Sequence, residues 1–373
     1  MISKQFLIAA TVAAASIAAA TAVPAKEFVY GSWVSAKHGV NKAGLEPMFK
    51  AVEKETNGAV KWKLLAGGQV VRARSTLAGI RDRIVDAGLV IQVFTRKDLK
   101  INNVIFDMQA FGDDPVAVAG AATEIVMLNC PGCLKEYKKN KTVYLGGYGV
   151  TPFQVTCKEN LTTIAQFKGK KIRAVGAGKR WVKGMGAVPV AMPPTEAVTA
   201  MQRGAIDCVL ASISWLRSYG YIDVVKTFVE FNTGMPRGIC IFCMNRDSWD
   251  SLTDNQKRIM WKHMPGVSAR ATIIGYVQED AKVKKLAMAK GIKFVKGGDD
   301  FKARKAAHTK SERAAIPKSM KKLGVRNPER LINKFLEIYP RWLKLAGSIN
   351  NDVDKFAAAL QSEIYSKIDP TKW

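Results

Sequence analysis

The chain has 373 residues, of which 48% are hydrophobic and 24% are charged. This composition is typical of a folded globular protein and excludes an intrinsically disordered chain, while the length favours two domains. The 58 Lys and Arg residues against 31 Asp and Glu give a formal net charge of +27. Such an excess indicates an anionic partner: a small anion, a membrane surface or nucleic acid. The chain has only three His residues, so we do not expect a His-rich metal centre.

The first 25 residues have the pattern of an export signal. Lys4 precedes an Ala-rich apolar run over residues 6–20, which is short for a membrane span of about 20 residues. Small residues predict cleavage near Ala22 or Ala25. We therefore predict that residues 1–25 are a signal peptide and that the mature chain is a soluble periplasmic protein. An exported protein does not meet the chromosome, so we expect no nucleic-acid partner.

The start of the mature chain alternates between strand and helix patterns. This order of strand, helix, strand, helix and strand is the signature of an α/β sheet. The last strand of this order, at residues 87–94, is a nearly continuous apolar run, as in a buried parallel strand. Strands are expected at residues 27–33, 60–65 and 87–94, and helices at 45–55 and 77–85.

The middle of the chain continues with the same two patterns. Helix is expected over most of residues 115–139 and again at 195–203, where Thr195 has the chemistry of an N-cap. Two α/β units without a flexible linker between them predict a chain that crosses between domains more than once. Further strands are expected at residues 143–148, 152–158, 171–175, 206–211 and 238–244.

Beyond Thr253 the sequence predicts only helices. Thr253 and Gln256 have the spacing of a capping box, and a long helix could continue to Lys290 unless Pro265 interrupts it. Another helix is expected from Asn327-Pro328-Glu329, because Pro suits the first helical turn. Much of the positive charge lies in this region, which suggests a solvated helical face or a docking face for an anionic membrane surface or a partner.

Three motifs occur in a fixed order in the middle of the chain: FKGKKIRAVG at 167–176, MGAVPVAM at 185–192 and TEAVTAMQRGAID at 195–207. In order and spacing they resemble the motifs of the substrate-binding proteins of tripartite ATP-independent periplasmic (TRAP) transporters. The resemblance covers most of the mature chain, including residues 49–69 and 245–256.

This resemblance implies an α/β, two-domain periplasmic solute-binding protein fold, with hinge strands and a long helix that spans both domains. We predict α/β domain I from residues 26–150 plus 239–280, and α/β domain II with the C-terminal helices from 151–238 plus 281–373. The implied function is capture of an organic acid in the cleft between the domains and its delivery to a TRAP-type membrane permease. We expect neither enzymatic activity nor a cofactor.

Arg173 is the leading ligand-binding candidate. It stands near the end of a predicted strand, two residues before Val175-Gly176. A guanidinium there can bind a carboxylate through two parallel hydrogen bonds, a geometry that Lys cannot copy. In the TRAP family the matching Arg binds the ligand carboxylate, and the alternative role is a salt bridge at the surface or between domains.

The chain departs from the family pattern at several polar positions. Phe153 stands where the family often has a second Arg, and Ala211 replaces the usual Asn. A sugar acid, which needs many hydroxyl partners, becomes a poor fit, because unpaired buried polar groups are costly. Candidates for an aromatic cleft are Trp33, Phe153, Trp181 and Trp215. Such a residue alone is more often part of the core, but Trp33 and Trp215 follow strand ends, which favours the cleft. Further candidates near strand ends are Gln69, Gln92, Ser212 and His38, the last of which could instead be a solvated loop residue.

The six cysteines leave two further functions open. Cys130 and Cys133, like Cys240 and Cys243, have C-x-x-C spacing, which suggests zinc or thiol chemistry. We expect neither, because the two pairs are far apart and the first lies within or near the end of a helical stretch. Structural disulfides are expected in an exported protein, with pairing undetermined and Cys157 a candidate neighbour of the second pair. The alternatives to solute binding are an exported thiol-disulfide oxidoreductase using Cys130 and Cys133, or a periplasmic interaction protein without a ligand.

Overall fold

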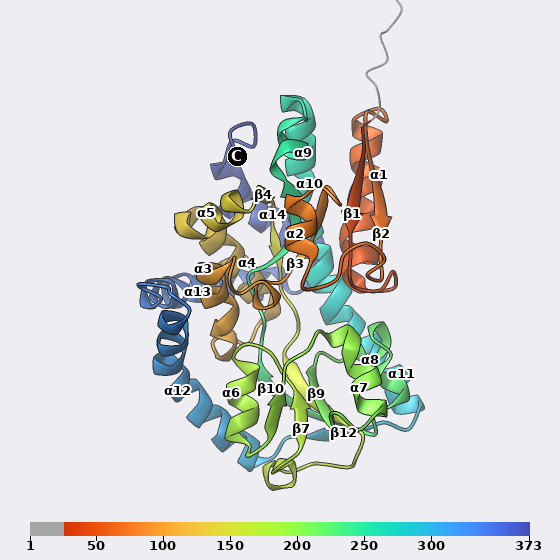
Figure 1. Ribbon diagram of the computed structural model, residues 1–373, viewed down its shortest axis with the longest axis vertical. Helices are drawn as coiled ribbons and strands as arrows, with labels where there is room; N and C mark the ends of the chain where they lie inside the picture. Colours follow the sequence, from red (N-terminus) through yellow and green to blue (C-terminus); the bar gives the residue numbers. More distant parts are fainter. Residues whose placement is uncertain (1–25) are drawn as a thin grey trace, which may run out of the picture.

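The computed structural model describes residues 26–373, which form two α/β units (Figure 1). The predicted signal peptide lies outside the described residues. Figure 1 shows the first sheet in the upper half of the molecule and the second sheet in the lower half. The predicted fold class, two α/β units joined by crossing segments, is confirmed.

The first sheet has six strands in the order β2-β1-β3-β11-β4, with β5 also paired to β11. β1 runs parallel to β2 and β3, whereas β11 is antiparallel to its neighbours. β3 and β11 are buried over their whole length, which explains their unbroken apolar sequence. The strands are β1 (Lys26–Gly31), β2 (Val60–Leu65), β3 (Ala87–Val90), β4 (Thr142–Tyr144), β5 (Gly147–Tyr148) and β11 (Ile239–Asn245).

The second sheet also has six strands, in the order β12-β10-β6-β9-β7-β8. Asp207 fixes the position of β7 beside β9, since its carboxylate accepts a hydrogen bond from the Lys171 backbone N–H at 2.8 Å. This contact is a physical reason for the Asp at the end of the third sequence motif. The strands are β6 (Phe153–Cys157), β7 (Lys171–Arg173), β8 (Val188–Val190), β9 (Cys208–Ala211), β10 (Thr227–Gly234) and β12 (Lys293–Lys296).

Helices cover both sheets and connect the two units. The first unit carries α1 to α5, and α6 to α8 lie beside the second sheet (Figure 1). Their bounds are α1 (Glu46–Glu55), α2 (Thr76–Arg81), α3 (Lys100–Asp107), α4 (Pro115–Glu124), α5 (Pro131–Lys139), α6 (Gly178–Gly184), α7 (Ala197–Gln202) and α8 (Trp215–Ser218). The later helices are α9 (Arg246–Asp250), α10 (Asp254–Thr272), α11 (Glu279–Ala289), α12 (Asp299–Lys322), α13 (Glu329–Ile349) and α14 (Val353–Glu363).

Four segments cross between the units, and the last is α12, which packs against α6 of the second unit and α3 of the first as it leads from β12 to α13. Residues 149–152 lead from β5 to β6, and residues 235–238 lead from β10 back to β11. The third is the predicted long helix, formed by α10, a π-helical segment at Ile273–Gln278 and α11. α10 packs against α1, α4 and α14, whereas α11 packs against α8. The capping box at its start is present as predicted, and Pro265 does not interrupt it.

The chain after Thr253 differs from the prediction in two ways. β12 is a strand that pairs with β10, although only helices were expected there. α13 and α14 pack against α4 and α10 and therefore lie on the first unit. The prediction had placed these C-terminal helices on the second unit. The Glu124 carboxylate in α4 holds α13 in place, because it accepts a hydrogen bond from Trp342 Nε1 at 2.6 Å. The predicted division of the chain near residues 150 and 238 stays a prediction.

Two local predictions are wrong. Thr195 caps no helix, because α7 begins two residues later with Glu196 as its N-cap and no side-chain capping bond. The strand predicted over 87–94 ends at Val90 and is followed by a 3₁₀ turn at Gln92–Phe94. This turn places Val93 and Phe94 between the two units.

All six cysteines form disulfides, which pair Cys130 with Cys133, Cys157 with Cys208, and Cys240 with Cys243. The second joins adjacent strands β6 and β9, so Cys157 is not beside Cys240 and Cys243 as anticipated. The first opens helix α5, where Cys130 is the N-cap, and directly follows the helical segment Ile125–Asn129, so the pair lies within a helical stretch as expected from sequence.

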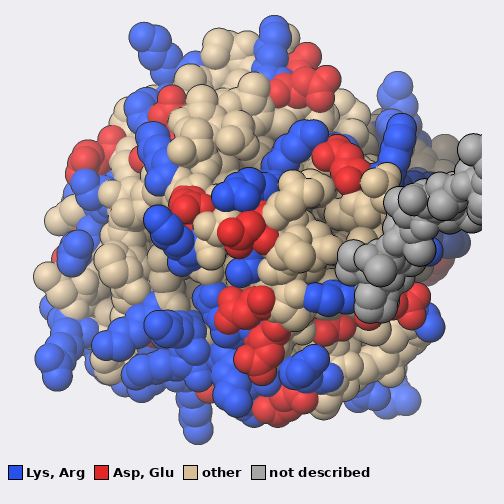
Figure 2. Space-filling view, turned by 90° about the horizontal axis from the view of Figure 1, so that it is seen from above, with Lys and Arg blue, Asp and Glu red and all other residues tan. Residues whose placement is uncertain are grey.

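Within residues 26–373, no single helix has the length and apolar character of a membrane span, and one bent pair, Pro115–Asn129 with Pro131–Lys139, meets these criteria only jointly. On the face seen in Figure 2, Lys and Arg side chains crowd along one edge, while many acidic side chains lie nearer the centre.

Candidate functional site

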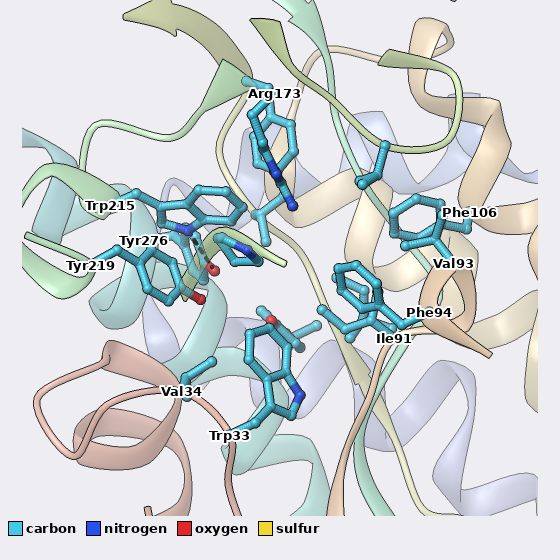
Figure 3. Close-up of a pocket in the computed structure, with 16 residues that line it drawn as sticks. Trp33, Val34, Ile91, Val93, Phe94, Phe106, Arg173, Trp215, Tyr219 and Tyr276 are labelled. Atoms are coloured by element: carbon cyan, nitrogen blue, oxygen red, sulfur yellow. Dashed lines mark hydrogen bonds between the residues drawn. The ribbon is translucent and has the colours of Figure 1, made fainter. Parts of the chain in front are cut away.

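A pocket lies where the two units meet (Figure 3). The first unit contributes Trp33 from the end of β1 and Phe94 from the turn after β3. The second unit contributes Phe153 from the start of β6, Arg173 from the end of β7 and Trp215 from the start of α8, which follows β9. Apart from Phe153, these residues follow the rule that ligands of open α/β sheets bind beyond the carboxyl ends of the strands. The lining residues are Trp33, Val34, Ile91, Val93, Phe94, Phe106, Tyr148, Val150, Phe153, Arg173, Val175, Pro194, Trp215, Tyr219, Ile239 and Tyr276.

Arg173 is the one charged residue in this lining. The residue is only 1% exposed, and burial lowers the pKa of its guanidinium. Nε donates a hydrogen bond to the Met192 carbonyl at 2.9 Å, and the guanidinium lies 5.6 Å from the ring centre of Trp215. Nη1 is buried and has no hydrogen-bond partner among residues 26–373. A buried charge without an acidic partner is costly, so this arrangement favours an anionic ligand at Nη1.

Aromatic side chains form most of the remaining wall. Phe153 packs edge-on against Trp215, with ring centres 4.8 Å apart, and Trp215 packs against Tyr219 at 5.1 Å. In Figure 3, Phe94 and Ile91 face Trp215 and Tyr219 across the pocket, and Trp33 lies at the end away from Arg173. Such flat apolar surfaces suit an aromatic or branched apolar group.

Tyrosine hydroxyls supply the other polar atoms of the pocket. Trp215 Nε1 donates a hydrogen bond to the Tyr276 hydroxyl at 3.3 Å, drawn as a dashed line in Figure 3. Burial raises the pKa values of Tyr219 and Tyr276, so both hydroxyls stay protonated at neutral pH. The pocket therefore holds one cation and neutral hydroxyls, which can receive a single carboxylate.

Asp280 supports this wall from behind. Its carboxylate accepts a hydrogen bond from the Ser214 backbone N–H at 2.6 Å, one residue before Trp215. Burial raises the pKa of Asp280 to about 6. Asp280 is a positioning residue for Trp215, because it fixes the loop after β9 without lining the pocket.

Four of the eight residues predicted to bind ligand come together here: Trp33, Phe153, Arg173 and Trp215. The other four are elsewhere, as is Trp181, a further candidate for the aromatic cleft. Gln69 is exposed beyond the turn at Gly67–Gly68. The buried side chains of Gln92 and Ser212 donate to the carbonyls of Gly238 and Thr151, and Trp181 stacks on Phe231 away from the pocket.

His38 does not reach the pocket but stands behind its tyrosines. Its ring centre lies 5.5 Å from that of Tyr219 and 5.8 Å from that of Tyr276. Nδ1 accepts a hydrogen bond from the Val40 backbone N–H, and burial lowers the pKa of His38 to about 3. His38 is therefore neutral at physiological pH, and it packs against the pocket wall and supplies no positive charge for an anion.

Sequence reasoning missed several lining residues. Tyr276 comes from the long crossing helix, where Gly275 lets the segment at Gly39 approach closely, since a Cβ on Gly275 would lie 3.0 Å from the Gly39 carbonyl carbon. Only that glycine in a long helix could have drawn attention to Tyr276. Phe94 follows β3 and could have been found by the same strand-end rule that selected Trp33. Phe106 and Tyr219 carry no local signal, because tertiary packing alone brings them to the pocket.

Neither metal nor thiol chemistry gains support from the geometry. Across the described part of the chain, no group of three or more His, Cys, Asp or Glu side chains could hold a metal ion. Cys130 and Cys133 open a helix, as in thiol oxidoreductases, but they are only 4% and 0% exposed.

Residues 30–316 match the family model described as bacterial extracellular solute-binding protein, family 7. Similar solved structures share this fold at low sequence identity. A marine metagenome TRAP solute-binding protein specific for aromatic acid ligands, in complex with 3-hydroxybenzoate, superposes with a TM-score of 0.75 at 20% identity, over 86% of this chain and 99% of that one.

Two further solved structures are similar. A TRAP periplasmic solute-binding protein from Bordetella bronchiseptica, with bound (R)- and (S)-mandelate, has a TM-score of 0.69 at 22% identity, over 84% of this chain and 98% of that one. A TRAP solute-binding protein from Rhodoferax ferrireducens, in complex with copurified benzoate, has a TM-score of 0.74 at 17% identity, over 86% and 99%. At these identities the likeness shows a shared fold.

Proposed function

The chain belongs to family 7 of the bacterial extracellular solute-binding proteins, and we propose that it binds an aromatic or apolar monocarboxylate and delivers it to a TRAP-type membrane permease. One observation carries this proposal: the unpartnered Nη1 of Arg173 faces a pocket whose other lining residues are uncharged. A carboxylate there would satisfy the buried donor, and the aromatic walls would cover the rest of the ligand. Three similar structures hold ligands of this class.

Binding requires the two units to move. The cavity volume is about 30 Å³, far below that of an apolar cavity able to hold benzene, about 150 Å³. Trp33 and Phe94 from the first unit and Arg173 from the second line it together, so separation of the units would open it. We propose hinge motion at the crossing segments 149–152 and 235–238, followed by closure around the ligand. The ligand stabilises closure only to the extent that it binds the closed state better.

We also propose where the protein acts and what it meets there. Family membership agrees with an extracytoplasmic location, and we propose export by the signal peptide at residues 1–25, with cleavage near Ala22 or Ala25. We propose no catalytic step, because the arrangement needs only binding and release. An exposed basic face would meet the permease or an anionic membrane surface through many weak contacts.

A thermal-shift screen tests the ligand class. The panel contains benzoate, 3-hydroxybenzoate, mandelate, succinate and a sugar acid. At one hundred times its dissociation constant, a true ligand stabilises the folded protein by about 2.7 kcal/mol. We expect the aromatic monocarboxylates to raise the melting temperature most. Stabilisation by succinate or the sugar acid alone would contradict the proposed class, and no stabilisation by any acid would favour an interaction protein without a ligand.

A further inference from the structure

A second cavity, of about 180 Å³, lies beside the ligand pocket and is lined by basic side chains. Arg74 and Arg96 reach it from the first unit, and Lys179 reaches it from the second. It shares Val93, Phe94 and Val175 with the ligand pocket, so one layer of side chains separates the two. We call this second cavity, lined by Arg74, Val93, Phe94, Arg96, Val175, Gly176, Lys179, Ala191 and Met192, the basic cavity.

The charges of the basic cavity are poorly balanced. Arg74 pairs with Glu196 across the two units, with 3.4 Å between Nη1 and Oε1, and both side chains are exposed. Neither Arg96 nor Lys179 forms an ion pair with any acid in residues 26–373. Asp107 raises the pKa of Lys179, but its carboxylate is already paired with Arg180 at 3.1 Å.

The two units thus bring like charges together at this cavity. Burial lowers the pKa of Lys179, and Arg96 on the opposite unit lowers it further, as do Lys183 and Arg180. Like charges that approach when two units close oppose closure, unless an anion lies between them. An anion bound there would remove this repulsion and connect the units, because its partners come from both.

The cavity is also linked to the primary site. Met192 lines the basic cavity, and its carbonyl is the acceptor that holds Arg173 Nε. The layer that separates the cavities contains Val93 and Phe94 from one unit and Val175 from the other. Movement of the units would therefore separate this layer and join the two cavities.

We infer that the basic cavity is an accessory anion site, in which Arg96 and Lys179 bind an anionic oxygen group and so favour closure of the two units. The inference rests on the proposed function for the identity of the primary ligand. The anionic group has two chemical sources: a second acidic group of the bound ligand, or a free inorganic oxyanion bound beside it.

Calorimetry with three ligands separates these sources. Benzoate, benzene-1,3-dicarboxylate and benzene-1,4-dicarboxylate are titrated into the protein in sodium chloride, and benzoate is titrated again in sodium sulfate at equal ionic strength. If the ligand supplies the anion, a dicarboxylate binds at least tenfold more tightly than benzoate. If a free oxyanion supplies it, sulfate strengthens benzoate binding at least threefold over chloride.

The double variant Arg96→Gln/Lys179→Gln tests which residues are responsible. In this variant we expect the gain in affinity, whether from the second carboxylate or from sulfate, to be less than twofold. The matched control, Lys97→Gln/Lys168→Gln, removes one exposed charge from each unit outside the basic cavity and should retain the gain. A gain that survives in the double variant, or that is absent from the wild type for both sources, would overturn the inference.

The design keeps the two proposals distinguishable. If no aromatic acid binds, the proposed function fails, and the accessory site is still measured by thermal shift in sulfate against chloride. Stabilisation by sulfate that is larger in the wild type and the control than in the double variant supports the accessory site. Equal stabilisation of all three proteins is a general salt effect and contradicts it.

Discussion

Arg173 and Arg180 are buried or half-buried arginines of the second unit with opposite surroundings. Arg173 ends β7 in an aromatic pocket, and its Nη1 has no partner within the described chain. Arg180 in α6 is fully engaged: Nε donates to Glu312 at 2.6 Å and Nη1 donates to Asp107 at 3.1 Å. Both acids are 1% exposed as side chains, and they come from α12 and α3. We call Arg180, Asp107, Glu312 and the adjacent His308 the charge cluster.

The difference separates a structural cation from a binding cation. In the charge cluster the positive charge of Arg180 is paired with two acids of the protein, and these bonds join α6 to helices on either side, so the cluster stabilises the arrangement of the units. Arg173 keeps hydrogen-bonding capacity that the protein does not use. A residue with unused capacity in a closed apolar site is suited to a ligand, whereas a fully paired one is not.

The largest expected effect comes from breaking the charge cluster. Arg180→Met leaves two buried carboxylates without their cation, which should cost about 3–5 kcal/mol of unfolding free energy. Urea unfolding measures this loss. Arg203→Met on the exposed surface is the matched control and should change stability by less than about 0.5 kcal/mol. Adding Asp107→Asn and Glu312→Gln to Arg180→Met should restore much of the loss, and a loss below about 1 kcal/mol in the single variant would contradict the account.

The same substitution at Arg173 should leave the stability of the protein intact and weaken ligand binding. Arg173→Met removes a buried, unpartnered charge, so the ligand-free protein should be as stable as the wild type or more stable. Binding of the best aromatic carboxylate should weaken by about 10- to 150-fold, which corresponds to the loss of about 1.5–3 kcal/mol. Arg173→Lys should also bind poorly, because an ammonium group cannot form the two parallel bonds. Affinity within twofold of the wild type, measured by calorimetry, would remove Arg173 from the site.

Acidification should affect the charge cluster through His308. Burial lowers the pKa of His308 to about 3, and Arg304 and Arg180 act in the same direction. His308 takes up a proton near pH 6.5 in the unfolded chain, but only near pH 3 in the folded protein. The stability that neutral His308 contributes is therefore fully present above pH 6.5 and is lost as the pH falls from 6.5 towards 3. Between pH 7 and pH 5, His308→Gln should lose less stability than the wild type, by on the order of 2 kcal/mol. Parallel losses in urea unfolding at both pH values would contradict this assignment.

The smallest effect is expected on the basic surface of α11. Lys284 and Lys290 pair with Glu230 and Asp223, which leaves Lys282 and Lys285 as its exposed lysines for a docking face. Lys282→Gln/Lys285→Gln should leave ligand affinity within twofold, because charges on a distant face are screened over about 8 Å. Association with anionic vesicles should weaken at low salt. A lower ligand on-rate with unchanged vesicle association would instead favour electrostatic steering of the ligand.

The sequence predicted the fold well where local patterns are strong. Continuous apolar runs marked β3 and β11, and the capping box at Thr253 marked the start of α10. β12 was missed, because its sequence KFVK has only two apolar residues between its lysines and its partner β10 is more than fifty residues away in sequence. The position of α13 and α14 on the first unit depends on distant contacts such as that of Trp342 with Glu124, which no local pattern reveals.

The same limit applies to the site. The strand-end rule and the family motifs selected Arg173, Trp33 and Trp215, which the structure brings to one pocket. Neither could show that Nη1 of Arg173 lacks a partner, nor that Arg96 and Lys179 from different units share a cavity. Those facts depend on how the units meet, and they are the basis of both proposals.

Calorimetric titration of the wild-type protein with benzoate and with benzamide tests the central claim most directly. The two molecules have nearly the same shape, but only benzoate carries the carboxylate that Arg173 is proposed to bind. We predict that benzoate binds and that benzamide binds at least tenfold more weakly or not at all, because a neutral amide forms weaker bonds with the guanidinium. Equal affinity for benzoate and benzamide would contradict the claim that a ligand carboxylate pairs with Arg173.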